Sequence, residues 1–225
     1  KRLAGATRYE TNLEILKEAG IAGGDILVCT GKNFADGLSS SAVNKPVLLV
    51  KDSLTSAQKD MLASASGGNI YVIGGTSAVN ERIENALKAY GNVTRISGAD
   101  RYKTSVGIAR TFIGSVDNAV AVYGLNFPDG LSGGSLAYTL KAPLILTANG
   151  KHGDAKAYTN PNGICSGAVL GGSGLISDKV VREIFAMPEG SQIVHYPAEL
   201  PACGHSRLSA TAAKAPTCTE AGNIA

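Results

Sequence analysis

The amino-acid sequence contains the same series of motifs twice, about 93 residues apart. The three recurring pairs are 2–11 (RLAGATRYET) and 95–104 (RISGADRYKT), 33–39 (NFADGLS) and 126–132 (NFPDGLS), and 71–77 (YVIGGTS) and 168–174 (AVLGGSG). A repeat of this length is too long for a solenoid unit and is typical of a small domain. The sequence therefore predicts two tandem domains, and two weak sites on one chain gain affinity from each other. A multivalent binder is the first expectation.

Apolar strands alternate with helical segments in each repeat. In the first repeat we expect strands at 25–30, 46–50 and 69–73, and helices at 11–20, 35–44, 56–65 and 77–90. The strands are continuous apolar runs, which is typical of strands that are buried on both faces. This alternation predicts a three-layer α/β domain with a parallel sheet. Cys29 lies in such a run opposite Val122 of the second repeat, so we expect a buried free thiol.

The second repeat follows the first at an offset of 93 residues up to Ser132 and of 97 from Pro143 onward. The four extra residues fall near 136–140 and amount to one helical turn, so the buried face of that helix is preserved. Pro161 should end the helix that precedes it.

We expect three segments, with one repeat at 1–94, a second at 95–187 and an extended tail at 188–225. Four prolines and few large apolar residues mark the tail. Cys203, His205 and Cys218 lie in this tail. They leave open half of a zinc site, a disulfide, or idle thiols in a disordered segment.

Composition and charge exclude several classes of function. The net charge of +3 lacks the dense basic tracts of nucleic-acid binders, and no apolar run is long enough to span a bilayer. The three histidines are not repeated, and the sequence has no nucleophile motif, phosphate-binding loop or metal-ligand cluster. We therefore expect no catalytic residues, no cofactor, no metal, no nucleic-acid partner and no membrane insertion.

The motif order resembles the cell wall binding repeat type 2 family of Gram-positive surface proteins. The residues that carry the resemblance are R-x-x-G-x-x-R-Y-x-T, N-F-x-D-G-L-S, P-V-L-L and V-I-G-G, over residues 2–187. The resemblance implies tandem Rossmann-like or flavodoxin-like domains that anchor secreted proteins non-covalently to an anionic polysaccharide of the cell wall. It also implies a secreted, cell-surface location.

The same resemblance assigns anchoring to a Pro-Ile-Leu-Leu element. Its matches here are Pro46, Leu48 and Leu49 in the first repeat and Pro143, Ile145 and Leu146 in the second. The family commonly has three copies about a pseudo-threefold axis, whereas this sequence has two. Either a third copy precedes residue 1 in the parent protein, or copies from other chains complete the assembly.

Two arginines are candidate ligand contacts. Arg8 and Arg101 precede helices, where a guanidinium could offer two donors to a phosphate or carboxylate. An internal ion pair, a helix cap, or packing between the repeats explains the same pattern.

Glycine turns form a second candidate set, with Gly75 and Thr76 in one repeat and Gly172 and Ser173 in the other. We expect them to join a strand directly to a helix N-terminus, which favours anions. Any tight turn between a strand and a helix requires glycines of the same kind, so a structural role explains them equally well.

The third candidate set follows the first strand of each repeat and consists of Asn33, Asp36, Asn126 and Asp129. Ligands of α/β proteins usually lie at this end of the sheet. A carboxylate there is a candidate general base, but capping of the next helix is the simpler role.

Three functions compete at this point. The leading one is anchoring to the wall by multivalent binding of an anionic polysaccharide. The second is an assembly scaffold, whose duplicated motifs pack copies against one another. The third, an enzyme domain associated with wall hydrolysis, is disfavoured by the lack of a duplicated acid or base pair.

Overall fold

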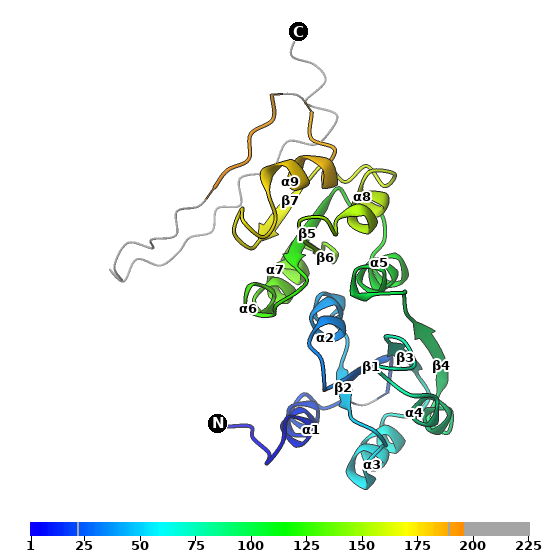
Figure 1. Cartoon of the computed structure of the whole chain (residues 1–225). Helices are drawn as coiled ribbons and strands as arrows, with labels where there is room; N and C mark the ends of the chain where they lie inside the picture. Colours follow the sequence, from blue (N-terminus) through cyan, green and yellow to red (C-terminus); the bar gives the residue numbers. More distant parts are fainter. Residues whose placement is uncertain (22, 189, 196–225) are drawn as a thin grey trace.

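A computed structural model describes residues 1–21, 23–188 and 190–195 (Figure 1). Cys203, His205 and Cys218, with most of the predicted tail, lie outside the described residues. The first repeat has a parallel sheet of order β2-β1-β3-β4, as in flavodoxin-like folds. Its strands are β1 (Ile26–Thr30), β2 (Val47–Val50), β3 (Asn69–Ile73) and β4 (Asn92–Ile96). Its helices are α1 (Arg8–Glu18), α2 (Ala35–Ser40), the 3-10 turn η1 (Ser41–Val43), α3 (Ser56–Ser64) and α4 (Glu81–Leu87).

The second repeat has a parallel sheet of order β6-β5-β7. Its strands are β5 (Asn118–Tyr123), β6 (Leu144–Thr147) and β7 (Ser166–Leu170). Its helices are α5 (Arg101–Phe112), α6 (Pro128–Leu131), α7 (Gly133–Leu140), α8 (Gly153–Thr159) and α9 (Asp178–Ile184). The predicted tandem of parallel α/β units is confirmed. The four extra residues lengthen α7, which stands where the first repeat has η1, and α8 ends before Pro161 as expected.

Local caps explain where several helices begin. Thr7 and Glu10 form a capping box, with Glu10 N donating to Thr7 Oγ1 at 3.3 Å and Thr7 N donating to Glu10 Oε2 at 3.0 Å. Helix α1 therefore begins at Arg8, three residues before the predicted start. Asn80 accepts a hydrogen bond from Ile83 N at 3.0 Å and starts α4 at Glu81.

The fourth strand of the first sheet differs from the prediction. No strand was expected at residues 92–96, but they pair in parallel with β3, from Asn69 opposite Asn92 to Ile73 opposite Ile96. The chain thus leaves the first repeat as a strand of its sheet, and the boundary expected at residue 94 falls inside β4.

Each sheet is buried on both faces. Helices α1, α3 and α4 cover one face of the first sheet, over residues such as Val28, Leu48 and Val72. Ile108 and Phe112 on α5 cover the other face, around Leu27, Cys29 and Ile96 of the sheet. Cys29 is a free cysteine as predicted, and it is fully buried. Burial raises its pKa to about 12.

The repeats share one apolar core. Ala35 on α2 and Ala42 on η1 pack with residues of the second sheet, including Val122, Leu144 and Leu146. Helix α2 lies beside α5 between the two sheets (Figure 1). Within the described part of the chain, no helix is long and apolar enough to cross a bilayer.

A glycine at the contact between the repeats provides a test of this packing. A Cβ at Gly134 on α7 would lie 2.0 Å from Ser41 Oγ and 2.5 Å from Ser41 Cβ, whereas a Cβ at Gly37 on α2 would meet nothing within 4 Å. We expect Gly134→Ala to lower the free energy of unfolding by about 1–3 kcal/mol through overpacking. Gly37→Ala should leave it unchanged or raise it by up to about 1 kcal/mol, because alanine favours the helix.

Urea denaturation followed by circular dichroism measures both changes. Equal effects from the two variants would show that the repeats do not pack as described.

Candidate functional site

The repeated N-F-x-D-G-L-S motifs lie where β1 and β5 end and the next helices begin. Asn33 Oδ1 accepts a hydrogen bond from Ala35 N at 3.3 Å, and Asn126 Oδ1 accepts one from Phe127 N at 2.9 Å. Both asparagines are exposed and hold the turn that leads into a helix. Their side chains have this structural role, and contact with a ligand stays a prediction.

The two phenylalanines of these motifs meet across the repeats. The ring centroids of Phe34 and Phe127 are 5.8 Å apart, and the rings are tilted. The Arg101 guanidinium lies over the Phe34 ring, with Cζ 5.4 Å from its centroid. A cation and an aromatic ring at this distance attract each other. The phenylalanines were not among the predicted site residues, although both copies of the motif contain one at the same position.

Arg8 and Arg101 perform the same task in each repeat. Arg8 Nη1 donates to Gly31 O at 2.8 Å, and Arg101 Nη1 donates to Gly124 O at 2.7 Å. Each arginine thereby ties the start of a helix to the backbone that follows the first strand of its repeat. Neither forms an ion pair among the described residues. Of the structural alternatives, packing between the repeats describes Arg101 best, whereas Arg8 is exposed.

Asp36 and Asp129 face the glycine turns that follow β3 and β7. A Cβ at Gly74 would lie 2.5 Å from Asp36 Oδ2, and one at Gly171 would lie 3.5 Å from Asp129 Oδ2. The backbone φ angles of these glycines are +99° and +132°, which other residues rarely adopt. The lack of a side chain at Gly74 thus allows the positive φ of the turn and leaves space for the Asp36 carboxylate.

The expected capping role of the two aspartates is wrong. The N-cap residues of α2 and α6 are Phe34 and Phe127, and neither helix has a side-chain cap. Asp36 and Asp129 lie one residue inside the first turn, where a carboxylate still interacts favourably with the helix dipole.

The pKa of Asp36 is raised by burial, and the positive charge of Arg101 opposes this shift. A raised pKa would suit a general base, but the nearby thiol of Cys29 is fully buried and its own pKa is raised to about 12, and the nearby Ser40 hydroxyl donates to Asp36 O at 2.7 Å. The described residues also hold no cluster of three or more His, Cys, Asp or Glu that could bind a metal ion.

The glycine turns do not open onto a helix N-terminus. Ala78 N and Val79 N both donate to Gly75 O, at 2.9 and 3.1 Å, so residues 75–79 form a closed turn. Leu175 N and Ile176 N donate to Gly172 O in the same way. Helices α4 and α9 begin only at Glu81 and Asp178, so the glycines do not join a strand directly to a helix N-terminus as expected, and their contact with a ligand stays a prediction. Thr76 and Ser173 are exposed in these turns.

Arg95 on β4 is a structural residue that the site prediction missed. Its Nη1 donates to Gly74 O at 2.6 Å, its Nη2 donates to Val79 O at 2.8 Å, and it pairs with Glu84 at 2.7 Å. It therefore holds the glycine turn between β3 and α4. The signal for it was its place at the head of the second copy of the R-x-x-G-x-x-R-Y motif.

The Pro-Val-Leu-Leu element of the first repeat and the Pro-Leu-Ile-Leu element of the second lie on the edge strands of the two sheets. Leu48 is 0% exposed, and Ile145 and Leu146 are each 1% exposed, so these side chains pack in the core. Pro46 O and Pro143 O accept hydrogen bonds at 2.9 Å from the first strand of their repeat.

Polar side chains cover the outer edges of these strands. Asn12 Nδ2 donates to Val47 O and Asn12 Oδ1 accepts from Leu49 N, each at 2.8 Å, while Ser105 Oγ accepts from Leu146 N at 3.1 Å. Such side chains satisfy the backbone groups that an edge strand leaves unpaired.

A cavity of about 350 Å³ lies between the beginnings of α1 and α3, at the carboxyl end of β2. It is lined by Thr7, Tyr9, Glu10, Leu13, Lys51, Asp52, Ser53, Thr55 and Gln58. None of the predicted site residues lines it. Lys51 is exposed, and it makes no ion pair in the described part of the chain.

A pH-dependent measurement tests the environment of Asp36. A carboxyl whose pKa is raised in the folded state holds its proton more tightly there than in the unfolded chain. Its ionisation therefore lowers stability as the pH rises from the ordinary value of 3.8 to the raised one. We expect Asp36→Asn to be more stable than the unmodified protein at pH 7, and the difference to vanish near pH 3.

Thermal unfolding at both pH values checks this, with Asp129→Asn as the matched substitution in the other repeat. A destabilised Asp36→Asn at pH 7 would contradict the raised pKa.

Comparisons with known proteins agree with the duplicated pattern. The model of the family described as "Cell wall binding domain 2 (CWB2)" matches residues 2–84 and 95–181. The chain is 34% identical over 188 residues to the amidase enhancer of Bacillus subtilis (strain 168), covering 81% of this chain and 26% of that protein. It is 28% identical over 203 residues to the N-acetylmuramoyl-L-alanine amidase LytC of the same organism, covering 82% and 38%. The chain thus spans less than half of either relative.

Two solved structures share the fold. Cwp6 from Clostridium difficile matches with a TM-score of 0.70 and 27% identity, over 83% of this chain and 31% of that chain. Cwp8 from the same organism matches with a TM-score of 0.70 over 83% of this chain and 34% of that chain, and its 20% identity shows the fold alone.

Proposed function

Because this chain belongs to the cell wall binding domain 2 family, we propose that it anchors a secreted protein to the Gram-positive wall. In this proposal it binds an anionic secondary polysaccharide non-covalently and at more than one point. The observation that carries the proposal is the family match to each repeat separately. Two copies on one chain strengthen weak binding through effective concentration.

Exposed cations of the first repeat are the best candidates for contact with such a polymer. Arg8, Lys32 and Lys51 are exposed and lie at the carboxyl end of the first sheet, beside the 350 Å³ cavity. The carboxyl end is where parallel α/β sheets generally bind ligands. Because Arg8 also braces Gly31 and Lys32 pairs with Asp52, Lys51 is the cation with no structural task in the described residues.

Sedimentation with cell walls tests the anchor. We expect the chain to pellet with Gram-positive walls, and to stay in solution after acid extraction of the secondary polymers. Raising the salt concentration should weaken binding, because screening reduces attraction between exposed charges. Lys51→Ala should weaken it severalfold, whereas Lys59→Ala removes an exposed charge on α3 and should not.

Binding that survives polymer extraction or high salt unchanged would contradict the charge-based anchor. Hydrolysis of purified walls by the chain would contradict a binding role without catalysis.

Assembly of copies is a second candidate, and the contact between the repeats favours it. The contact is not reciprocal: α2 packs on β6 of the second sheet, whereas no contact of comparable extent joins α6 to the first sheet in the described residues. A head-to-tail contact of this kind leaves one contact surface of the first repeat and one of the second repeat without a partner repeat. Leu38 on α2 is 8% exposed, whereas its counterpart Leu131 on α6 is 66% exposed. Tyr102 on α5 is buried, whereas its counterpart Tyr9 is half-buried.

If another copy covers these surfaces, sedimentation velocity should show association that rises with protein concentration. Leu131→Asp should abolish that association and leave the melting temperature nearly unchanged, because Leu131 is exposed. A chain that stays monomeric at all concentrations would argue against assembly between chains.

A further inference from the structure

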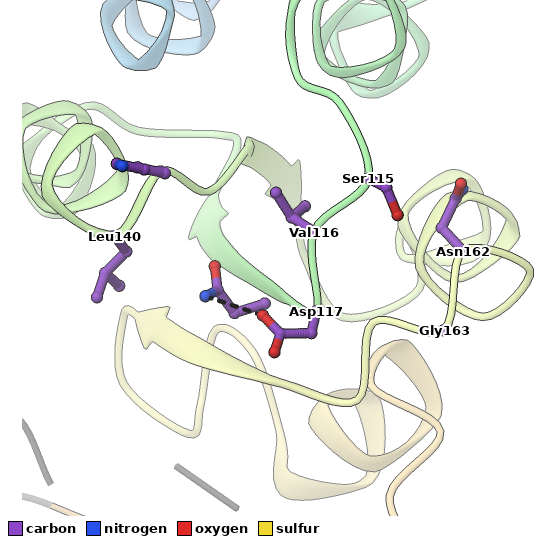
Figure 2. Close-up of a pocket in the computed structure, with 8 residues that line it drawn as sticks. Ser115, Val116, Asp117, Leu140, Asn162 and Gly163 are labelled. Carbon is purple, nitrogen blue, oxygen red and sulfur yellow. Dashed lines mark hydrogen bonds between the residues drawn. The ribbon is translucent and has the colours of Figure 1, made fainter. Parts of the chain in front are cut away.

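A second cavity lies at the amino end of the second sheet, away from the contact between the repeats. Its volume is about 540 Å³. It is lined by Ser115, Val116, Asp117, Asn118, Leu140, Lys141, Asn162 and Gly163, which all precede a strand or begin one. Figure 2 shows Ser115 and Asn162 on one side, Leu140 on the other and Asp117 between them.

The first repeat closes the equivalent place with its own side chains. Asp25 accepts hydrogen bonds from Lys45 Nζ at 2.8 Å, from Asn69 Nδ2 at 2.9 Å and from Asn69 N at 3.2 Å. This clamp joins the beginnings of three strands. It also holds the pKa of Asp25 below its ordinary value, chiefly through the hydrogen bond from Lys45.

The second repeat replaces every member of the clamp. Asn118, Ala142 and Ser166 stand where Asp25, Lys45 and Asn69 stand in the first repeat. Ala142 is fully buried and has no polar group, so the ion pair is lost.

Two polar groups at the cavity are left without partners in the described structure. Asn118 Oδ1 is buried and accepts no hydrogen bond, while its Nδ2 reaches Asp117 Oδ1 only at 3.4 Å. Lys141 is exposed and forms no ion pair among the described residues. An unpaired buried acceptor is unfavourable, and a donor from a bound molecule removes that penalty.

Lys141 also has a backbone conformation that suits another residue better. Its φ is +52°, the same as that of Asn44, its counterpart in the first repeat. Asparagine tolerates the left-handed region, whereas lysine is uncommon there. The backbone conformation therefore does not explain a lysine at this position, whereas its ammonium group at the cavity gives it a role.

We propose that this cavity binds one glycosyl unit of the wall polymer through its hydroxyl groups. Asp117, Asn118 and Asn162 offer acceptors to sugar hydroxyls, and Lys141 offers a donor. Val116 and Leu140 give apolar contact for the face of a sugar ring. One carboxylate and one ammonium leave the lining without net charge, so it favours a neutral unit over an anion. The volume lies in the range of small-molecule pockets.

The inference rests on the proposed function for the source of the sugar, but it concerns a different surface. No residue that lines this cavity belongs to the shared core of the two repeats. Assembly with further copies through α6 or Tyr9 would therefore leave it open. Because the contacts are hydrogen bonds with a neutral ligand, salt should affect them little.

The experiment is an NMR titration of the isotope-labelled full chain with neutral disaccharides of glucose, galactose and N-acetylglucosamine. We expect one of them to shift the side-chain amide signals of Asn118 and Asn162 at millimolar concentration. Lys141→Asn should weaken that affinity about tenfold, since it removes a charged donor, and asparagine suits the backbone there. Ser115→Trp should abolish binding by filling the cavity. Lys103→Asn removes an exposed charge on α5 and should change nothing.

Absence of any shift overturns the glycosyl site, as does a shift that Ser115→Trp leaves intact. The two proposals fail separately. If the chain sediments with walls but binds none of the three sugars, the anchoring proposal stands and the glycosyl site is contradicted. A chain that binds a disaccharide but does not sediment retains this site and loses the anchor.

Discussion

Burial of α2 against the second sheet is the interaction on which the arrangement of the two repeats depends. It takes a helix that the first repeat would otherwise expose and gives it a place in the core of its neighbour, with Ala35 and Ala42 beside Leu144 and Leu146. An arginine and a phenylalanine of the repeated motifs then meet across the boundary, where Arg101 lies over Phe34. Burial raises the pKa of Asp36 on the same helix, and the positive charge of Arg101 from the second repeat opposes that shift. The contact between the repeats thus brings a positive charge near the Asp36 carboxyl group.

The layers of the fold were predictable because the strands are continuous apolar runs. Leu27 and Cys29 match Val120 and Val122, and all four are fully buried. The fourth strand was not predictable in the same way. Residues 92–96 carry Asn, Thr and Arg, and a strand at the edge of a sheet can expose such side chains without penalty. Its pairing with β3 depends on a neighbour more than twenty residues away.

For the candidate site, the sequence predicted which residues recur but not what each of them does. The repeated motifs identified which residues recur, yet recurrence alone did not distinguish a ligand contact from a brace. Arg8 and Arg101 reach carbonyls 23 residues further along the chain, and only the folded backbone brings those carbonyls close. The buried Leu48 and the closed glycine turns lead to the same conclusion. What recurs here largely maintains the fold, while positions that differ, such as Asn118 for Asp25, mark where the repeats have separate tasks.

Strand β4 has a mechanical consequence for any ligand that spans both repeats. A flexible tether lets two sites search many separations, and it averages over ligands of different spacing. Here residues 92–96 of the connecting segment are paired with β3 in the first sheet, Arg95 binds the neighbouring turn, and only four residues separate β4 from α5. The two repeats therefore present their surfaces at one fixed separation and orientation. A polymer with a matching period meets both at once without ordering a linker, and one with a different period meets only one. Strand β4 therefore sets the spacing of polymer units that both repeats can bind together.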